Sequence, residues 1–143
     1  MKKTPKNANK PNKTRKCRFS KNSDIVKMLM EMLNMIKLYH WKTHSYATHI
    51  ATDDLYAKLN GHVDKFVEVY LGKTNSRIKD AEFQLNIIQY NRKRNFHSKM
   101  LEYIEKLTDL NLCFDEKKDT DLINIRDDIL VDLNQFIYLL SFK

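Results

Sequence analysis

The sequence contains few of the residues that form tight turns. Its 143 residues include only two glycines and two prolines, and both prolines precede residue 12. Hairpins of a β-sheet depend on these residue types, so their scarcity favours long helices. A chain of this length has room for one domain with one hydrophobic core. We therefore expect an all-α protein with a single folded domain over residues 23–143.

Cysteine and long apolar runs are also scarce. The two cysteines, Cys17 and Cys113, have neither the spacing of a metal finger nor the number of a disulfide framework, and we expect both to be reduced thiols. No apolar run approaches the length of a membrane span, and the N-terminus lacks the apolar core of a signal peptide. We expect a soluble intracellular protein without a membrane partner, either cytoplasmic or associated with the nucleoid.

The first 22 residues contain no acidic residue. They hold nine of the 26 Lys and Arg residues, which leaves 17 basic against 18 acidic residues and a net charge of −1 for the rest of the chain. Because the segment has almost no aliphatic residues, we predict a disordered tail over residues 1–22. Such a tail binds DNA phosphates without reading sequence, or only keeps the protein soluble, or serves as a nuclear-localisation signal. The candidate DNA-binding residues are Lys2, Lys3, Lys6, Lys10, Lys13, Arg15, Lys16, Arg18 and Lys21.

Four amphipathic segments follow the tail. Apolar residues recur at intervals of three and four over residues 25–43, 47–72, 95–110 and 121–142, which predicts four helices and a four-helix bundle. Ser23 is the expected N-cap of the first helix, and Gly72 is the expected C′ residue of the second. Residues 83–90 fit a short strand or a short helix, and we favour a helix. The residues expected to face the core are Ile25, Met28, Leu29, Met32, Met35, Ile36, Tyr39, Leu55, Leu59, Val63, Phe66, Tyr70, Met100, Leu101, Ile104, Leu107, Leu122, Ile125, Ile129, Leu133, Phe136, Ile137 and Leu140.

Residues 40–72 contain two pairs of potential metal ligands. His49 and Asp53 are four residues apart, and so are Asp64 and Glu68. On one helix, at about 100° per residue, all four side chains fall within a sector of about 100°. Asp53 and Asp64, however, are separated by roughly 16 Å along the helix axis, which exceeds the coordination sphere of one metal ion. One chain therefore cannot close a site with all four residues.

A second copy of the same helix brings the two pairs together. If the helices pack antiparallel about a twofold axis between residues 58 and 59, His49 and Asp53 of one chain lie level with Glu68 and Asp64 of the other. Gly61 lies near the centre and permits a close approach, and a twofold dimer is the commonest oligomer. Imidazole and carboxylate groups inside a helical bundle suit iron or manganese. The competing interpretation is a solvated helix face with charges at a common spacing.

The same stretch resembles a known family. The run His40-Trp41, then His49-x3-Asp53 and Asp64-x3-Glu68, closing on Leu71-Gly72, is similar to the Dps miniferritins, the ferritin-like proteins of starved cells. The resemblance covers the first two predicted helices, and DLINIRDDILVDLNQFIYLLSF looks like the last helix of that family. The resemblance implies a ferritin-like bundle and a di-iron ferroxidase centre between twofold-related subunits. The catalytic and metal-binding residues that it implies are His40, His49 and Asp53 from one subunit, with Asp64 and Glu68 from its partner.

The resemblance also implies a function. Members of that family oxidise Fe(II), preferably with hydrogen peroxide, store ferric mineral in a hollow dodecamer and protect DNA, several of them through a basic tail. Trp41 would lie beside the centre and quench radicals, and zinc or manganese would be surrogates for iron. His44, one helical turn after His40, is a competing ligand because only a short turn separates His40 from His49. The alternative function is an architectural DNA-compacting protein on the same bundle with a weak or inactive metal site.

Overall fold

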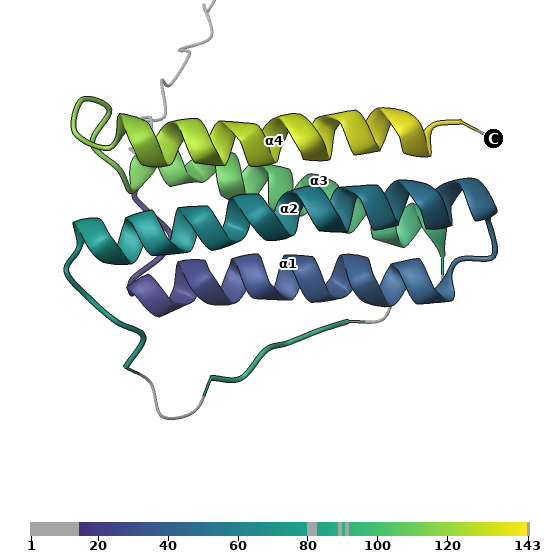
Figure 1. The fold of residues 1–143 in the computed structure, drawn as a ribbon, viewed down its shortest axis with the longest axis horizontal. Coiled ribbons are helices and arrows are strands. Elements are labelled where there is room, and N and C mark those ends of the chain that lie inside the picture. The colour runs from purple at the N-terminus through teal and green to yellow at the C-terminus, as the bar shows by residue number, and fades with distance from the viewer. Residues whose placement is uncertain (1–14, 80–82, 89, 91, 143) are drawn as a thin grey trace, which may run out of the picture.

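The computed structural model describes residues 15–79, 83–88, 90 and 92–142, and its regular elements are all helical (Figure 1). Helix α1 spans Asn22–Lys42, α2 spans Tyr46–Lys73, α3 spans Lys93–Thr108 and α4 spans Thr120–Leu140, with a short 3-10 helix, η1 (Asp109–Leu112), after α3. The described residues include no strand. These elements confirm the predicted all-α helical bundle. None of the described helices is long and apolar enough to cross a membrane.

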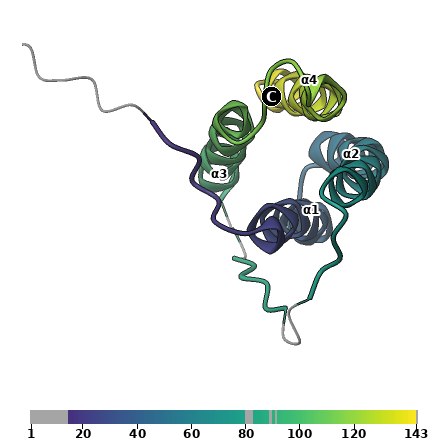
Figure 2. The ribbon, with the colours of Figure 1, turned by 90° about the vertical axis from the view of Figure 1, so that its left-hand side faces the viewer.

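The helices form two antiparallel hairpins. The first joins α1 to α2 through residues 43–45, and the second joins α3 to α4 through η1 and residues 113–119. The connection between α2 and α3 returns the chain to the opposite end of the bundle, so that these two helices run in the same direction (Figure 1). Seen end-on, the helices occupy four corners, and both α1 and α4 are neighbours of α2 (Figure 2). The bundle therefore has one long crossover between two hairpins.

The apolar faces of the four helices meet in one core. All residues that were predicted to face inward from α1 and α2 are buried, and so are those of α4 except Ile137, which packs against the core from a partly buried position. Tyr39 stacks on Phe96 with ring centroids 3.8 Å apart. The prediction for α3 was wrong at Leu101, which is 46% exposed. The inward stripe of α3 instead includes Phe96 and Tyr103 at the same helical spacing as Met100 and Leu107.

Two predictions of helix ends were wrong. Helix α1 begins at Asn22, one residue before Ser23. The carboxylate of Asp24 caps its N-terminus by accepting hydrogen bonds from the backbone N–H groups of Ser20 and Lys21. Gly72 lies inside α2 and has no positive φ. Asn75, with φ of 46°, is the residue in the left-handed region after this helix. Side-chain amides tolerate that region, which explains how the helix ends without a glycine.

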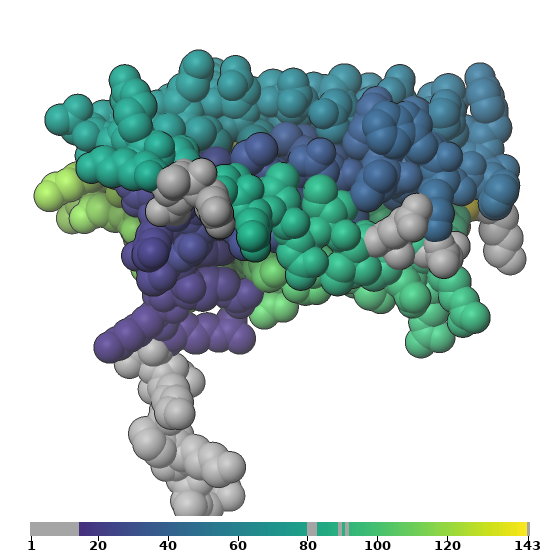
Figure 3. Space-filling model, turned by 90° about the horizontal axis from the view of Figure 1, so that it is seen from below, coloured from purple at the N-terminus to yellow at the C-terminus, as the bar shows by residue number. Residues whose placement is uncertain are grey.

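The connection between α2 and α3 lies along the outer face of α1 (Figure 3). Described residues 83–88 and 90 are irregular, so the short helix predicted over residues 83–90 is wrong for them. The backbone N–H of Asn86 donates to Glu31 Oε1 on α1 at 2.7 Å, and Tyr90 packs against the core. Tyr90 is therefore the residue of this segment that packs against the core, whereas Ile87 and Ile88 are exposed.

The segment before α1 is attached to the far end of α3. Cys17 forms a disulfide with Cys113, so the prediction of two reduced thiols was wrong. The two cysteines are 96 positions apart and meet only because the second hairpin packs beside α1. Phe19 packs against the core, and Arg18 pairs with Asp109. Residues 15–21 therefore do not follow the predicted disorder of residues 1–22, whereas residues 1–14 lie outside the described part of the chain.

Candidate metal centre

His40 and His49 face each other across the turn between α1 and α2. Nδ1 of His40 lies 3.0 Å from the carbonyl oxygen of His49, and Nδ1 of His49 lies 3.1 Å from the carbonyl oxygen of His40. The rings stack with centroids 3.9 Å apart. A carbonyl oxygen only accepts, so each Nδ1 carries the proton and donates it. In the neutral form of each ring, Nε2 then carries no hydrogen and is available as a ligand.

The turn itself explains why the two histidines meet. Thr43 ends α1 in an extended conformation, and its N–H donates to the carbonyl of Tyr39. Ser45 begins α2 as its N-cap, and its hydroxyl accepts from the N–H of Thr48 at 3.3 Å. Both helix ends are therefore closed within three residues, which brings the last turn of α1 beside the first turn of α2. His44 is exposed in this turn.

Thr52 contacts the histidine pair from the buried side. Its side chain is fully buried, and its hydroxyl donates to the carbonyl oxygens of Thr48 and His49 at 2.8 and 2.9 Å. The same oxygen lies 3.1 Å from His40 Nδ1. His40 is only 7% exposed, so a well-defined set of buried partners orients its ring. The sequence pattern did not identify Thr52, although it is only three residues after His49.

Asp53 lies beside His40, one member of the histidine pair. Its Oδ1 lies 3.8 Å from Nε2 of His40 and 3.6 Å from Nζ of Lys37. We call His40, His49 and Asp53 the histidine half-site. The carboxylate of Asp53 is largely exposed, so a further ligand can approach it from outside the bundle. All three members of the half-site were predicted.

Lys37 is a neighbour of the half-site that the sequence pattern missed. Its ammonium lies 4.7 Å from the ring centroid of Tyr56 and 5.8 Å from that of Trp41, besides its contact with Asp53. Trp41 is 68% exposed. Helical spacing was the available signal, because Lys37 is one turn before Trp41 and three residues before His40. The ammonium places a positive charge where a cation bound to Asp53 would lie.

Asp64 and Glu68 do not reach the histidine half-site within one chain. Both lie further along the uninterrupted helix α2, where both are exposed. We call them the carboxylate half-site. Among the residues that the structure describes, no three His, Cys, Asp or Glu side chains come together to hold a metal ion. One chain thus contributes two separate groups of potential ligands on the same side of α2.

The surface of α2 between the two half-sites has small side chains. Ala57, Asn60 and Gly61 are all exposed. A Cβ atom added at Gly61 would meet no atom within 4 Å. The fold of a single chain therefore does not require a glycine there, although glycine lowers the stability of a helix interior by about 1 kcal/mol relative to alanine. His62 points elsewhere and pairs with Asp132 of α4 at 3.2 Å.

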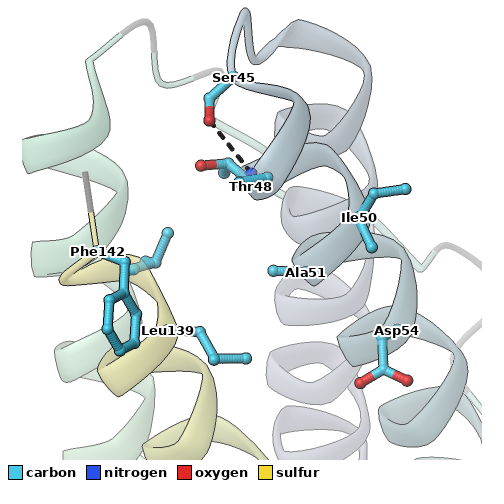
Figure 4. A pocket seen from close by; sticks show the side chains of 9 residues that line it. Ser45, Thr48, Ile50, Ala51, Asp54, Leu139 and Phe142 are labelled. Atoms are coloured by element: carbon cyan, nitrogen blue, oxygen red, sulfur yellow. Dashed lines mark hydrogen bonds between the residues drawn. The ribbon is translucent and has the colours of Figure 1, made fainter.

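An apolar groove of about 480 Å³ lies beside this region, between the start of α2 and the end of α4. Figure 4 shows Ile50 and Ala51 of α2 on one side and Leu139 and Phe142 on the other, with Asp54 at the edge. None of the histidine or carboxylate half-site residues lines it. The groove and the candidate ligands are therefore separate features of the surface.

The comparison with known proteins places the candidate ligands inside a family. A model described as a family of unknown function (DUF5856) matches residues 40–140, a range that begins at His40 and includes both half-sites. Neither a curated protein nor a solved structure matches the chain. The match defines the extent of the family region and carries no activity with it.

Proposed function

We propose that this chain, which belongs to the DUF5856 family of unknown function, is a ferritin-like protein of the Dps type that oxidises Fe(II). One observation carries the proposal. Nδ1 of each histidine, His40 and His49, contacts the backbone carbonyl oxygen of the other, which leaves both Nε2 atoms as potential ligands, and Nε2 of His40 lies 3.8 Å from the carboxylate of Asp53. Metal-binding histidines in proteins are typically oriented in this way, with the second ring nitrogen donating to a carbonyl or carboxylate.

The topology supports this proposal. Ferritin-like bundles are distinguished from simple up-and-down bundles by one long crossover connection. Here the crossover joins α2 to α3, so α1 runs parallel to α4 and α2 parallel to α3 (Figure 1). In such bundles carboxylate and imidazole groups from facing helices supply the iron ligands.

A twofold dimer completes the site in this proposal. The midpoint between His49 and Glu68 coincides with that between Asp53 and Asp64, so two antiparallel α2 helices present the histidine half-site of one chain to the carboxylate half-site of the other. The exposed small residues at this midpoint allow the two helices to approach closely. Assembly of such dimers into a hollow dodecamer would then provide a cavity for ferric mineral.

Each residue has a distinct role toward Fe(II), which is the substrate. His40 and His49 offer imidazole nitrogens, and Asp53, Asp64 and Glu68 offer carboxylate oxygens, a donor set that suits ferrous iron. Binding at Asp53 displaces the ammonium of Lys37 from that carboxylate. Trp41 lies exposed beside the half-site, where an oxidisable indole can give up an electron to a radical produced from peroxide.

Iron oxidation in solution tests the proposal. Purified protein should oxidise Fe(II) with hydrogen peroxide faster than buffer does, and Asp64→Ala with Glu68→Ala should abolish the difference. The matched control is Glu116→Ala with Asp128→Ala, which removes two exposed carboxylates from other parts of the chain. An unchanged rate in the Asp64 and Glu68 variant, or an equal loss in the control, would contradict the site. Measuring the oligomer mass of each variant separates loss of ligands from loss of assembly.

DNA binding through the basic N-terminal segment is a second candidate function. The specific observation is its charge, because residues 1–22 hold nine cations and no acid. In an oligomer the segments act together, and avidity strengthens individually weak phosphate contacts. This function does not need an active metal site and would also suit an architectural protein.

Deletion of residues 1–14 tests the DNA-binding function without touching the disulfide. The deletion removes Lys2, Lys3, Lys6, Lys10 and Lys13. We expect weaker DNA binding and a smaller salt dependence, by about 0.9 in the logarithmic slope for each phosphate contact that is lost. The control replaces these five lysines by arginine and should retain the slope. Equal binding by the deleted and complete chains would contradict a role of the tail.

A further inference from the structure

Arg15 and Arg18, two cations of the basic N-terminal segment, are bound to an acid of the same chain. A guanidinium nitrogen of Arg15 lies 3.7 Å from Asp109, and Arg18 pairs with the same carboxylate. The side chain of Asp109 is only 12% exposed, whereas those of Arg15 and Arg18 are 74% and 39% exposed, so the shielding is on the side of the acid. Cys17 stands between the two arginines in the sequence and is bonded to Cys113, directly after η1. The covalent bond and the ion pairs therefore hold the same short segment.

The surface to which this segment is attached is held together by a buried arginine. Arg126 of α4 is buried and donates to the carbonyl oxygens of Leu107 and Thr108 and to the side chain of Asn111. Cys113 packs against the core. The anchor on the second hairpin is therefore fixed independently of the segment that precedes α1.

Without the disulfide, Arg15 and Arg18 are held by their ion pairs with Asp109, by a pair of Arg18 with Glu105 at 3.8 Å, and by the packing of the neighbouring Phe19 against the core. Ion pairs near the surface contribute weakly, because water and salt screen them and two long side chains must be ordered. The disulfide keeps the arginines close to Asp109 and so raises their effective concentration beside it. Both cysteines are only partly buried, so small thiols and oxidants can reach them.

We propose that the Cys17–Cys113 bond is a redox switch that sets how many cations the N-terminal segment offers to a polyanion. In the oxidised protein, Arg15 and Arg18 are bound to Asp109. In the reduced protein, the segment detaches and both arginines are released. The release rests only on the contacts described above, whereas its effect on DNA rests on the DNA-binding function proposed above.

The chemistry of the switch balances with ordinary co-reactants. A dithiol reduces the bond by thiol–disulfide exchange, which forms two cysteine thiols and oxidises the dithiol to its own disulfide. Hydrogen peroxide reverses the step. One thiolate attacks peroxide to form a sulfenic acid and hydroxide, and the hydroxide takes up the proton that the thiol lost, which gives the first water. The second thiol then attacks the sulfenic sulfur and displaces the second water to form the disulfide.

Limited trypsin digestion of the full-length protein tests the release. Cleavage after Lys16 and Arg18, followed by mass spectrometry, should be at least about tenfold faster with a dithiol than in the oxidised protein, because cleavage follows the population of the detached form. The variants Cys17→Ser and Cys113→Ser should show the faster rate with or without the dithiol. Equal rates in oxidised and reduced wild-type protein, or a slow rate in both serine variants, would overturn the proposal.

The salt dependence of DNA binding tests the consequence of the release. Release of two cations should increase the logarithmic slope by about 1.8 for each engaged chain. The matched control, Arg15→Gln with Arg18→Gln, keeps Lys16 as a cleavage site and should retain redox-dependent cleavage while losing the change in slope. If cleavage depends on redox state but the slope does not change, the segment is released but DNA binding by Arg15 and Arg18 is refuted. If neither changes, the switch itself is refuted.

Discussion

His40 and His49 each donate Nδ1–H to the backbone carbonyl of the other, at 3.0 and 3.1 Å. The arrangement ties the ends of two helices together and at the same time selects one tautomer for both rings. Thr52, buried beneath them, is the third member of this arrangement. Removing the hydroxyl of Thr52 therefore tests how the histidine rings are oriented while both potential ligands stay in place.

We expect Thr52→Val to destabilise the fold by about 1–2 kcal/mol, because the hydroxyl is lost without a change of shape and a buried polar partner of His40 loses a contact. It should also weaken metal binding, measured by titration with Zn(II), since the His40 ring becomes less well oriented. Thr48→Val, at a neighbouring buried threonine, is the matched control and should leave metal affinity unchanged. Equal metal affinities of the two variants would contradict a positioning role of Thr52.

Mixed oligomers should recover activity that neither parent has. We expect His49→Ala with Asp53→Ala to be inactive, and Asp64→Ala with Glu68→Ala to be inactive as well. Random dimers of the two contain one intact site in each mixed pair, so roughly a quarter of the wild-type sites should return. Co-expression of the two chains with different tags, followed by the Fe(II) oxidation assay, measures this fraction. Failure of mixed dimers to oxidise iron would show that the two half-sites do not meet across a twofold axis.

Gly61→Ala should have opposite effects on the chain and on the dimer. No atom lies within 4 Å of the added Cβ, so we expect the helix to become more stable by up to about 1 kcal/mol. The dimer should become weaker if the second copy of α2 approaches at this point. Gly72→Ala, which also has open space but lies far from the predicted axis, should give only the first effect. Sedimentation and denaturation at low concentration measure the two effects, and equal dimer affinities would argue against an axis between residues 58 and 59.

Arg126→Leu should be strongly destabilising. Arg126 is 4% exposed, and its guanidinium donates to the carbonyl oxygens of Leu107 and Thr108 in the last turn of α3, so the substitution leaves buried acceptors without donors. We expect a loss of about 2–4 kcal/mol by urea denaturation. Asp127→Ala removes only the exposed partner of the same guanidinium and should cost less than about 1 kcal/mol. Similar losses in the two variants would contradict the capping role of Arg126.

Acid should weaken the start of α1. Burial alone raises the pKa of Asp24, but hydrogen bonds from Ser20 and Lys21 outweigh it, and the pKa lies below its usual value. The folded state therefore gains stability from this carboxylate above its unfolded pKa of about 4, and loses it as the pH falls through the lower folded pKa. Asp24→Asn should be less stable than wild type at pH 7, and the difference should shrink toward pH 3. A difference that is constant over this range would contradict the role of the charge.

The local parts of the structure were predictable from the sequence. Every inward residue expected on α1 and α2 is buried, because a helix with a period of 3.6 residues has one possible face for that pattern. His49 and Asp53 of the histidine half-site were identified for the same reason, since they are one helical turn apart, whereas His40 was identified only through the family resemblance. Thr52 and Lys37 were missed because a threonine or a lysine on a helix has many roles, and only the packing of α1 on α2 selects one of them.

Long-range contacts were not predictable from one sequence. The bond between Cys17 and Cys113 and the course of residues 83–88 along α1 depend on where the second hairpin packs, which periodicity does not encode. The end of α2 was not predictable for a related reason. The helix continues past Gly72 to Lys73, and the residue in the left-handed region is Asn75.

The disulfide also changes what a single cut in the backbone would produce. The connection between α2 and α3 is the only stretch of main chain that joins the two hairpins, and Cys17 precedes the first hairpin whereas Cys113 belongs to the second. A protease that cleaves this connection once would therefore leave an oxidised protein of two polypeptides that are still covalently joined. The two hairpins would then part only after reduction and unfolding, so the molecule is topologically a closed loop and not an open chain.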